Sequence, residues 1–170
     1  MAKLFETITD ISANVETIRN RRYGVIEVTE GKFTAIHFRP WPKLISAAEA
    51  QWLGGWHHGR LKKDHCLMYY NQPLGHTNFL ALKYTVSSFG TTYKTFRRTC
   101  LILDEVAKIK KTDAIVAEVS NTRISDRFMQ RMGWEQHLPH SKKRHFIKRF
   151  YGDYPEAMSE ELAKELIAAG

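Results

Sequence analysis

Apolar and polar residues alternate along the chain with the periods of helices and strands. Five apolar residues near the start lie at spacings of four, three, four and three: Leu4, Ile8, Ile11, Val15 and Ile18. Such a stripe runs along one side of an α-helix, so the pattern predicts a helix over residues 3–19. Residues 24–30 and 32–38 are rich in β-branched residues and flank Gly31, which predicts a β-hairpin.

The middle of the chain predicts two strands, a long helix and a further strand. Residues 66–70 and 79–86 have strand composition and are separated by turn residues. One wide apolar stripe over residues 96–111 predicts a helix that packs on a sheet, and the apolar run 114–119 predicts a central strand covered on both faces. The succession of strand, helix and strand predicts a right-handed crossover between two parallel strands.

The remaining elements complete a single domain over residues 1–170, with its core in residues 24–150. The apolar spacing predicts a helix that ends at Gly133, a late strand over 144–150, and a C-terminal helix over 156–168. Strands and helices mixed in this order predict an α/β (α+β) fold. We expect a mixed, mostly antiparallel sheet with helices on both faces.

The composition is typical of a folded domain. The chain has 170 residues, of which 43% are hydrophobic and 12% aromatic, so it is long enough to bury one core and is unlike a disordered segment. Its apolar runs are far too short to span a bilayer, and its first residues lack a secretory signal. We therefore expect a cytoplasmic protein with no membrane span. The two cysteines, Cys66 and Cys100, are expected to be free, buried thiols.

The charge balance indicates a polyanionic partner. The chain has 26 Lys and Arg against 18 Asp and Glu, which leaves a formal net charge of +8. Nucleic acid, an anionic surface and a small cofactor that carries several phosphates are all compatible with this charge. Net charge alone does not separate these partners, and it also serves solubility.

The later part of the chain resembles a known family. The run Ala-Glu-Val-Ser-Asn over 117–121 is followed by a helix that closes in Phe-Met-Gln-Arg-Met-Gly-Trp over 128–134. Together with the preceding strand and helix, this stretch resembles the core of the GNAT N-acetyltransferase superfamily over roughly residues 77–150. The resemblance implies a GNAT-like acyltransferase that moves an acetyl or other acyl group from acyl-coenzyme A to an amine. The acceptor would be an amine-bearing small molecule or protein.

The resemblance also implies that the start of the long helix receives the pyrophosphate of acetyl-CoA or another acyl-CoA. The sequence departs from the family here, because residues 87–99 contain Gly90 as their only glycine. A helix start still offers unpaired N–H groups, and nearby hydroxyls and cations add further donors. An ordinary capped helix with a solvated basic turn is the alternative interpretation. The candidate cofactor-binding residues are Val86, Ser87, Ser88, Thr91, Thr92, Lys94, Arg97, Arg98 and Asn121.

Candidate catalytic chemistry centres on Glu118. The position at which many family members have a proton-donating Tyr is Met129 here, and Met has no proton to donate. Glu118 lies in an apolar strand, where burial would raise the pKa of its carboxyl and suit it to deprotonate an ammonium group. Pairing of Glu118 with a Lys or Arg at the end of the strand is the alternative.

Three aromatic residues in one Gly-bounded loop are candidate acceptor-binding residues: Trp56, His57 and His58. In the family's order of elements, this loop falls where acceptor-binding segments lie. A helix-terminating loop with Trp56 plugged into the core is the alternative. His137, His140 and His145 match no zinc spacing, so we expect no metal site.

The densest positive segment gives a second functional hypothesis. Lys142 and Lys143 precede a strand that also contains Arg149, and in this strand Arg144, Phe146, Lys148 and Phe150 alternate and would share one face. Such a face could stack bases and contact phosphates. The alternative function is therefore a catalytically inactive GNAT-like module that binds nucleic acid or another polyanion. A solvated edge strand protected by its lysines is the plainer interpretation.

Overall fold

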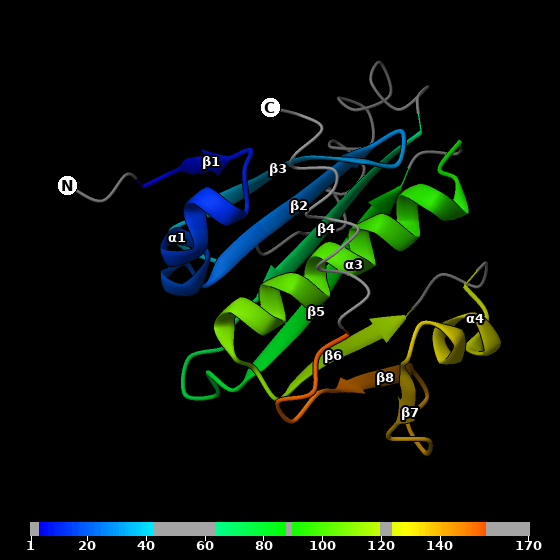
Figure 1. Cartoon of the computed structure of the whole chain (residues 1–170). Helices are drawn as coiled ribbons and strands as arrows, with labels where there is room; N and C mark the ends of the chain where they lie inside the picture. Colours follow the sequence, from blue (N-terminus) through cyan, green and yellow to red (C-terminus); the bar gives the residue numbers. More distant parts are fainter. Residues whose placement is uncertain (1–3, 43–63, 88–89, 120–123, 156–170) are drawn as a thin grey trace.

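The computed structural model describes residues 4–42, 64–87, 90–119 and 124–155. Its described strands form one sheet of eight, in the order β1-β3-β2-β4-β5-β6-β8-β7 (Figure 1). The strands are β1 (Glu6–Ile8), β2 (Tyr23–Thr29), β3 (Lys32–Arg39), β4 (His65–Asn71), β5 (Phe79–Ser87), β6 (Ala114–Val119), β7 (Glu135–His137) and β8 (Arg144–Arg149). The described helical elements are η1 (Ser12–Asn14), α1 (Val15–Asn20), α3 (Tyr93–Lys110) and α4 (Asp126–Arg131).

The sheet is mixed and mostly antiparallel, as the sequence predicts. β5 and β6 pair in parallel, whereas the other neighbouring pairs in the described sheet are antiparallel. The helix α3 connects β5 to β6, so the expected strand, helix and strand crossover is confirmed. The described elements therefore form the mixed α/β (α+β) arrangement that the sequence predicts.

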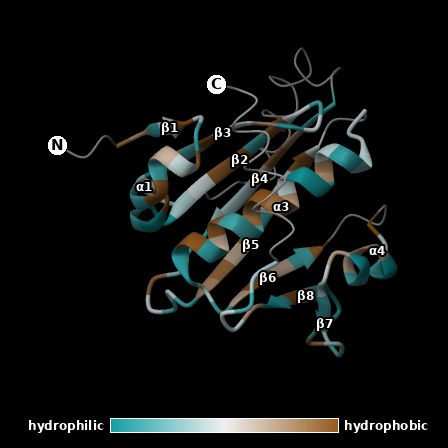
Figure 2. Ribbon diagram, viewed as in Figure 1, coloured by the Kyte–Doolittle hydropathy of each residue, from teal (hydrophilic) through white to brown (hydrophobic). Residues whose placement is uncertain are grey.

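The core lies between α3 and one face of the sheet. Side chains of β2 and β4, such as Ile26 and Met68, pack with Ile102 and Val106 of α3, and all four are fully buried. Figure 2 shows brown, apolar residues interspersed with teal ones along α3, as expected for a helix with one buried side. On the opposite face of the sheet, a smaller buried cluster is formed by Val25, Leu67 and Tyr69.

The predicted helix over residues 3–19 is wrong in its first half. Glu6–Ile8 is the strand β1, which pairs antiparallel with β3, and helical structure begins only at Ser12. Ile8, Ile11 and Ile18 are buried, whereas Val15 is half-buried and Leu4 is exposed, so the apolar stripe marks core residues only in part. The side chain of Asp10 accepts a hydrogen bond from the Ala13 N–H and so begins the helical turn there.

Other sequence expectations are confirmed within the described residues. Gly133 follows Met132, the C-cap of α4, and has φ of +86°, the left-handed conformation expected of a glycine that ends a helix. Cys66 and Cys100 are free and buried. None of the described helices is both long and apolar enough to cross a membrane. The predicted C-terminal helix over 156–168 lies outside the described residues.

Candidate functional site

The two parallel strands β5 and β6 separate part of the way along their length. Their pairing runs from Phe79 and Ala114 to Leu82 and Ala117, yet β5 continues to Ser87 and β6 to Val119. Figure 1 shows the two arrows diverging beyond this point, toward the end of the sheet where α3 begins. Beyond the last pair, the facing edges of β5 and β6 are not hydrogen-bonded to each other.

Beyond this point β5 remains paired with β4, and β6 remains paired with β8, and these pairings cause the separation. In the β4–β5 ladder, Tyr69 pairs with Tyr84 and Tyr70 with Leu82, so Lys83 is an extra residue that forms a bulge in β5. Bulges bend a strand and increase its twist. On the other side, Glu118 and Val119 continue to pair with β8. The bulge therefore turns β5 away from β6 at the point where their pairing ends.

Glu118 is the first residue of β6 beyond the parallel pairing, but it is not buried. Its side chain is 44% exposed, and Oε1 lies 3.1 Å from Nζ of Lys143, which is itself exposed. The expectation of burial is therefore wrong, and the alternative of a strand-end ion pair is observed. Ala117 belongs to the core on the α3 side, so alternation along the strand directs Glu118 to the opposite face. The catalytic role of Glu118 stays a prediction.

A carboxylate from another part of the chain, which the sequence does not single out, lies against the start of α3. Asp64, just before β4, accepts hydrogen bonds from Thr92 N and Thr92 Oγ1 at 2.8 Å each, and from Thr95 Oγ1 at 2.6 Å. Thr92 is also the N-cap of α3, because its Oγ1 accepts the Thr95 N–H. Partial burial acts to raise the pKa of Asp64, but the hydrogen bonds from Thr95 and Thr92 outweigh it and lower that pKa.

The cofactor-binding candidates that the structure describes differ in burial and in their hydrogen-bond partners. Thr91 Oγ1 donates to the His65 carbonyl at 2.8 Å, and Thr92 is bonded to Asp64. Arg98 is buried, whereas Ser87, Lys94 and Arg97 are exposed and Val86 packs beside the cluster of Val25, Leu67 and Tyr69. The three acceptor-binding candidates, Trp56, His57 and His58, and two cofactor-binding candidates, Ser88 and Asn121, lie outside the described residues.

The strand edges of β5 and β6 and the start of α3 determine which parts of acyl-coenzyme A suit this site. Beyond Leu82 and Ala117 the facing edges of β5 and β6 pair with no other strand in the part of the chain that the structure describes. Such edges suit an extended arm that contains amides, because the arm can hydrogen-bond to both strands. The diphosphate does not fit the start of α3, because the Asp64 carboxylate already accepts the hydrogen bonds of Thr92 and Thr95 there. A second anion at this place would be repelled by the first.

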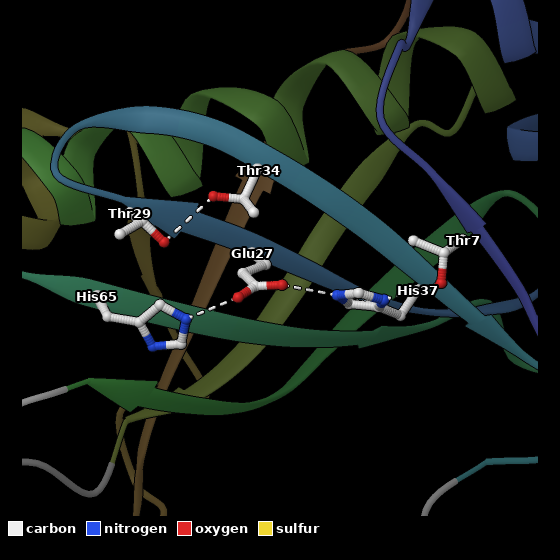
Figure 3. A network of polar contacts seen from close by, with 6 residues as sticks. All are labelled: Thr7, Glu27, Thr29, Thr34, His37 and His65. Carbon is white, nitrogen blue, oxygen red and sulfur yellow. Dashed lines mark hydrogen bonds and ion pairs between the residues drawn. The ribbon is translucent and has the colours of Figure 1, made fainter. Parts of the chain in front are cut away.

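A second polar cluster lies on the face of the sheet opposite α3 (Figure 3). Glu27 of β2 bridges two imidazoles: its Oε2 lies 2.7 Å from His37 Nε2 and its Oε1 lies 2.9 Å from His65 Nε2. His37 Nδ1 lies 3.0 Å from Thr7 Oγ1. A carboxylate only accepts, so Nε2 of His37 carries a proton, and in the neutral ring Nδ1 accepts from Thr7. The cluster joins the four neighbouring strands β1, β3, β2 and β4.

The sequence contains a signal for this cluster. Glu27, His37 and His65 are polar residues within or next to apolar stretches of three strands that become neighbours. The hydrogen bonds to His37 and His65 lower the pKa of Glu27 well below its usual range, although partial burial opposes them. The Glu27 carboxylate therefore stays ionised at neutral pH and stabilises the sheet.

This lowered pKa predicts a loss of stability in acid. Because the folded protein holds the Glu27 pKa below the unfolded value of about 4.3, the stabilisation is complete above that pH and declines as the pH falls below it. Glu27→Gln should cost about 1.5–3 kcal/mol at pH 6, and the difference from the parent should shrink between pH 4.3 and pH 3. Urea unfolding across this range measures it, with Glu135→Gln as a surface control. A difference that is constant with pH would contradict this interpretation.

The predicted polyanion-binding face of β8 points into the protein. Phe146, Lys148 and Phe150 are buried, and Lys148 Nζ lies 2.6 Å from Asp104 Oδ2 of α3. Arg144 is bonded to Asp126 at 2.6 Å and lies over the Phe146 ring. The alternation was predicted correctly, but β8 lies between β6 and β7 rather than at an edge, so this face covers the core. Both predictions for this segment, a face that stacks bases and a solvated edge strand, are therefore wrong.

The exposed cations of this segment are fewer than the sequence suggests. Arg149 is exposed but is paired with Glu135, which leaves Lys142 and Lys143 exposed in the turn before β8. Lys143 contacts Glu118. Among the described residues, no three His, Cys, Asp or Glu side chains are grouped so as to hold a metal ion.

Comparison with known proteins gives similarity to solved structures at low identity. The chain is 13% identical to a protein from Desulfovibrio desulfuricans described as an acetyltransferase of the GNAT family, with a TM-score of 0.43 over 86% of this chain and 96% of that one. It is 12% identical to nourseothricin acetyltransferase, with a TM-score of 0.39 over 86% and 99% of the two chains. It is 10% identical to apo FdhC, a nucleotide-linked sugar GNAT, with a TM-score of 0.42 over 96% and 93%. No protein-family model and no curated protein matches the chain. Similarity at this level carries no information about ligands or activity.

Proposed function

We propose that this chain transfers an acyl group from an acyl thioester of the acyl-coenzyme A type to an amine. The observation that carries the proposal is the end of the β5–β6 pairing after Leu82 and Ala117, with both strands continuing. Two unpaired strand edges that face each other can bind an extended, amide-containing chain as an added strand. The arm of a pantetheine thioester has this chemistry.

Glu118 is the proposed base because it lies on β6 directly beyond the last parallel pair. It takes one proton from the ammonium group of the acceptor, and the free amine then bonds to the thioester carbonyl carbon. The carbon–sulfur bond breaks, the second nitrogen proton passes to the departing sulfur, and Glu118 returns its proton to water. Met129 is buried and has no proton to give, so no side chain at that position assists the sulfur.

Hydrogen exchange tests where the thioester binds. Addition of S-acetylpantetheine should slow the exchange of amides in residues 83–87 and 118–119, because the bound arm pairs with the facing edges of β5 and β6, which pair with no other described strand. Amides of β2 and β3 should exchange as before, since these strands already pair on both sides. Product formation from a panel of primary amines and a lysine peptide is followed by mass spectrometry in parallel. Protection elsewhere, or none at saturating thioester, would exclude this site.

Polyanion binding is the second candidate, and its observation is the exposure of Lys142 and Lys143. Two lysines that neutralise two phosphates of a single strand predict a slope of about −1.4 in the logarithm of affinity against the logarithm of salt concentration. Replacing both lysines by Ala should abolish the slope, whereas replacing Lys32 and Lys108 should not. Fluorescence anisotropy with a labelled oligonucleotide measures this, and affinity that does not depend on salt would exclude the surface.

A further inference from the structure

We infer that Asp64 takes the place of a donor's diphosphate at the start of α3, so that this chain recognises its thioester by the acyl-pantetheine end alone. The inference rests on the proposed function and names the donor class. Suitable donors are acyl thioesters of pantetheine, whether or not a nucleotide diphosphate follows the pantetheine.

The first argument is the use of the donors at the helix start. A helix N-terminus binds an anion through the N–H groups of its first turn and through nearby hydroxyls. Here the Thr92 N–H, the Thr92 hydroxyl and the Thr95 hydroxyl all point to the two oxygens of Asp64, at 2.6–2.8 Å. The Thr95 N–H is bonded to Thr92 Oγ1. An incoming phosphate would have to displace a carboxylate that is covalently part of the chain.

The second argument is that Asp64 is held in place by its backbone. The Glu30 N–H donates to the Asp64 carbonyl at 2.7 Å, and the next residue, His65, pairs with Thr29 of β2. The side chain of His65 is fixed in turn by Glu27, and Thr91 Oγ1 donates to the His65 carbonyl. Thr95 is fully buried, so its hydroxyl has a fixed position. The carboxylate therefore belongs to a rigid corner of the sheet.

The third argument is electrostatic. The dipole of α3 favours one negative charge at its start, and Asp64 supplies this charge. The surrounding hydrogen bonds hold the pKa of Asp64 below its usual value, so the carboxylate is ionised at neutral pH and repels a second anion. The positive charge of Lys94 already interacts with this carboxylate and acts to lower its pKa. The diphosphate of coenzyme A would therefore add little to the affinity of this chain.

Titration calorimetry of the parent protein tests the inference without any variant. Coenzyme A and pantetheine share the thiol arm and differ in the nucleotide diphosphate. Their dissociation constants should agree within about threefold if the diphosphate finds no site. Coenzyme A that binds tenfold or more tightly than pantetheine would overturn the inference and leave the proposed function intact.

Asp64→Asn tests the role of the carboxylate itself. Asn keeps the shape and the acceptor for the Thr92 N–H but removes the charge. The ratio of coenzyme A affinity to pantetheine affinity should rise at least tenfold in this variant. Asp10→Asn is the matched control, because Asp10 also accepts a backbone N–H at the start of a helical turn, and its ratio should not change. Equal ratios in the parent and Asp64→Asn would overturn the inference.

Inorganic pyrophosphate separates failure of the inference from failure of the proposed function. Pyrophosphate should bind Asp64→Asn at least tenfold more tightly than the parent, even if neither protein binds a thioester. Absence of thioester binding with this difference present would contradict the proposed function and support the inference. Equal behaviour of the two folded proteins toward pyrophosphate, whether both bind it or neither does, would overturn the inference.

Discussion

Glu118→Gln should lower the turnover rate of acyl transfer by roughly 10² to 10⁴ while the thioester binds almost as tightly as before. Gln has nearly the same shape as Glu but does not take a proton, so the variant removes the base and keeps the surface. Glu118 is 44% exposed and its ion pair with Lys143 lies at the surface. Ion pairs at the surface contribute about 0–1 kcal/mol to the free energy of unfolding, so the melting temperature of the variant should change little.

Two controls separate the base from the ion pair. Lys143→Gln removes the partner of Glu118 and leaves the carboxylate, so it should keep most of the turnover rate. Glu135→Gln removes an exposed carboxylate of the edge strand β7, which is paired with Arg149 and separated from β6 by β8, and it should have no effect. Steady-state rates and melting temperatures on the same preparations decide the question. Turnover that is unchanged in folded Glu118→Gln would remove Glu118 from the mechanism.

Strands and helices whose apolar residues recur with one clear period could be predicted from the sequence, because burial of one face requires apolar residues at that spacing. β2 and β3 flank Gly31, which has φ of +74°, and α3 has one apolar side that packs on the sheet. The N-terminal segment was not predictable in the same way. Ile8 and Ile11 are buried in the same core from a strand and a turn, so a stripe at helical spacing arose without a continuous helix. Pairing with the edge of β3, which the spacing does not reveal, decided the structure there.

The candidate site was only partly predictable, because its contacts join residues that are distant in the sequence. The start of α3 and the end of β5 were expected to lie together, and the chain order alone requires this. Asp64 could not be assigned to the same place, because its contacts with Thr92 and Thr95 depend on the β4–β5 register. The burial of Glu118 was mispredicted because the apolar run indicates which strand is central but not which of its faces is covered at the end.

The basic segment around β8 was also predictable only in part. Its buried pair of Lys148 and Asp104 gives the largest expected effect on stability. Alternation placed Arg144 and Lys148 on one face, but only the position of β8 in the sheet decides that this face meets α3. Lys148 is therefore a partner for Asp104 in the core, with both residues less than 10% exposed. Burial raises the pKa of the Asp104 carboxyl, although the attraction of Lys148 acts to lower it. The cost of removing both charges from water is thus only partly offset by their attraction.

Removal of one partner should destabilise the fold severely. Lys148→Met leaves the Asp104 carboxylate buried without its cation, and Asp104→Leu leaves the ammonium group of Lys148 in the same position. Each single variant should lower the free energy of unfolding by about 3–5 kcal/mol, because an uncompensated charge remains in the core. The double variant, Asp104→Leu with Lys148→Met, removes both charges and should recover most of this loss. Urea unfolding of the four proteins at pH 7 measures the cycle. Single variants that each lose less than about 1 kcal/mol would show that water reaches the pair and that it does not stabilise the contact between α3 and β8.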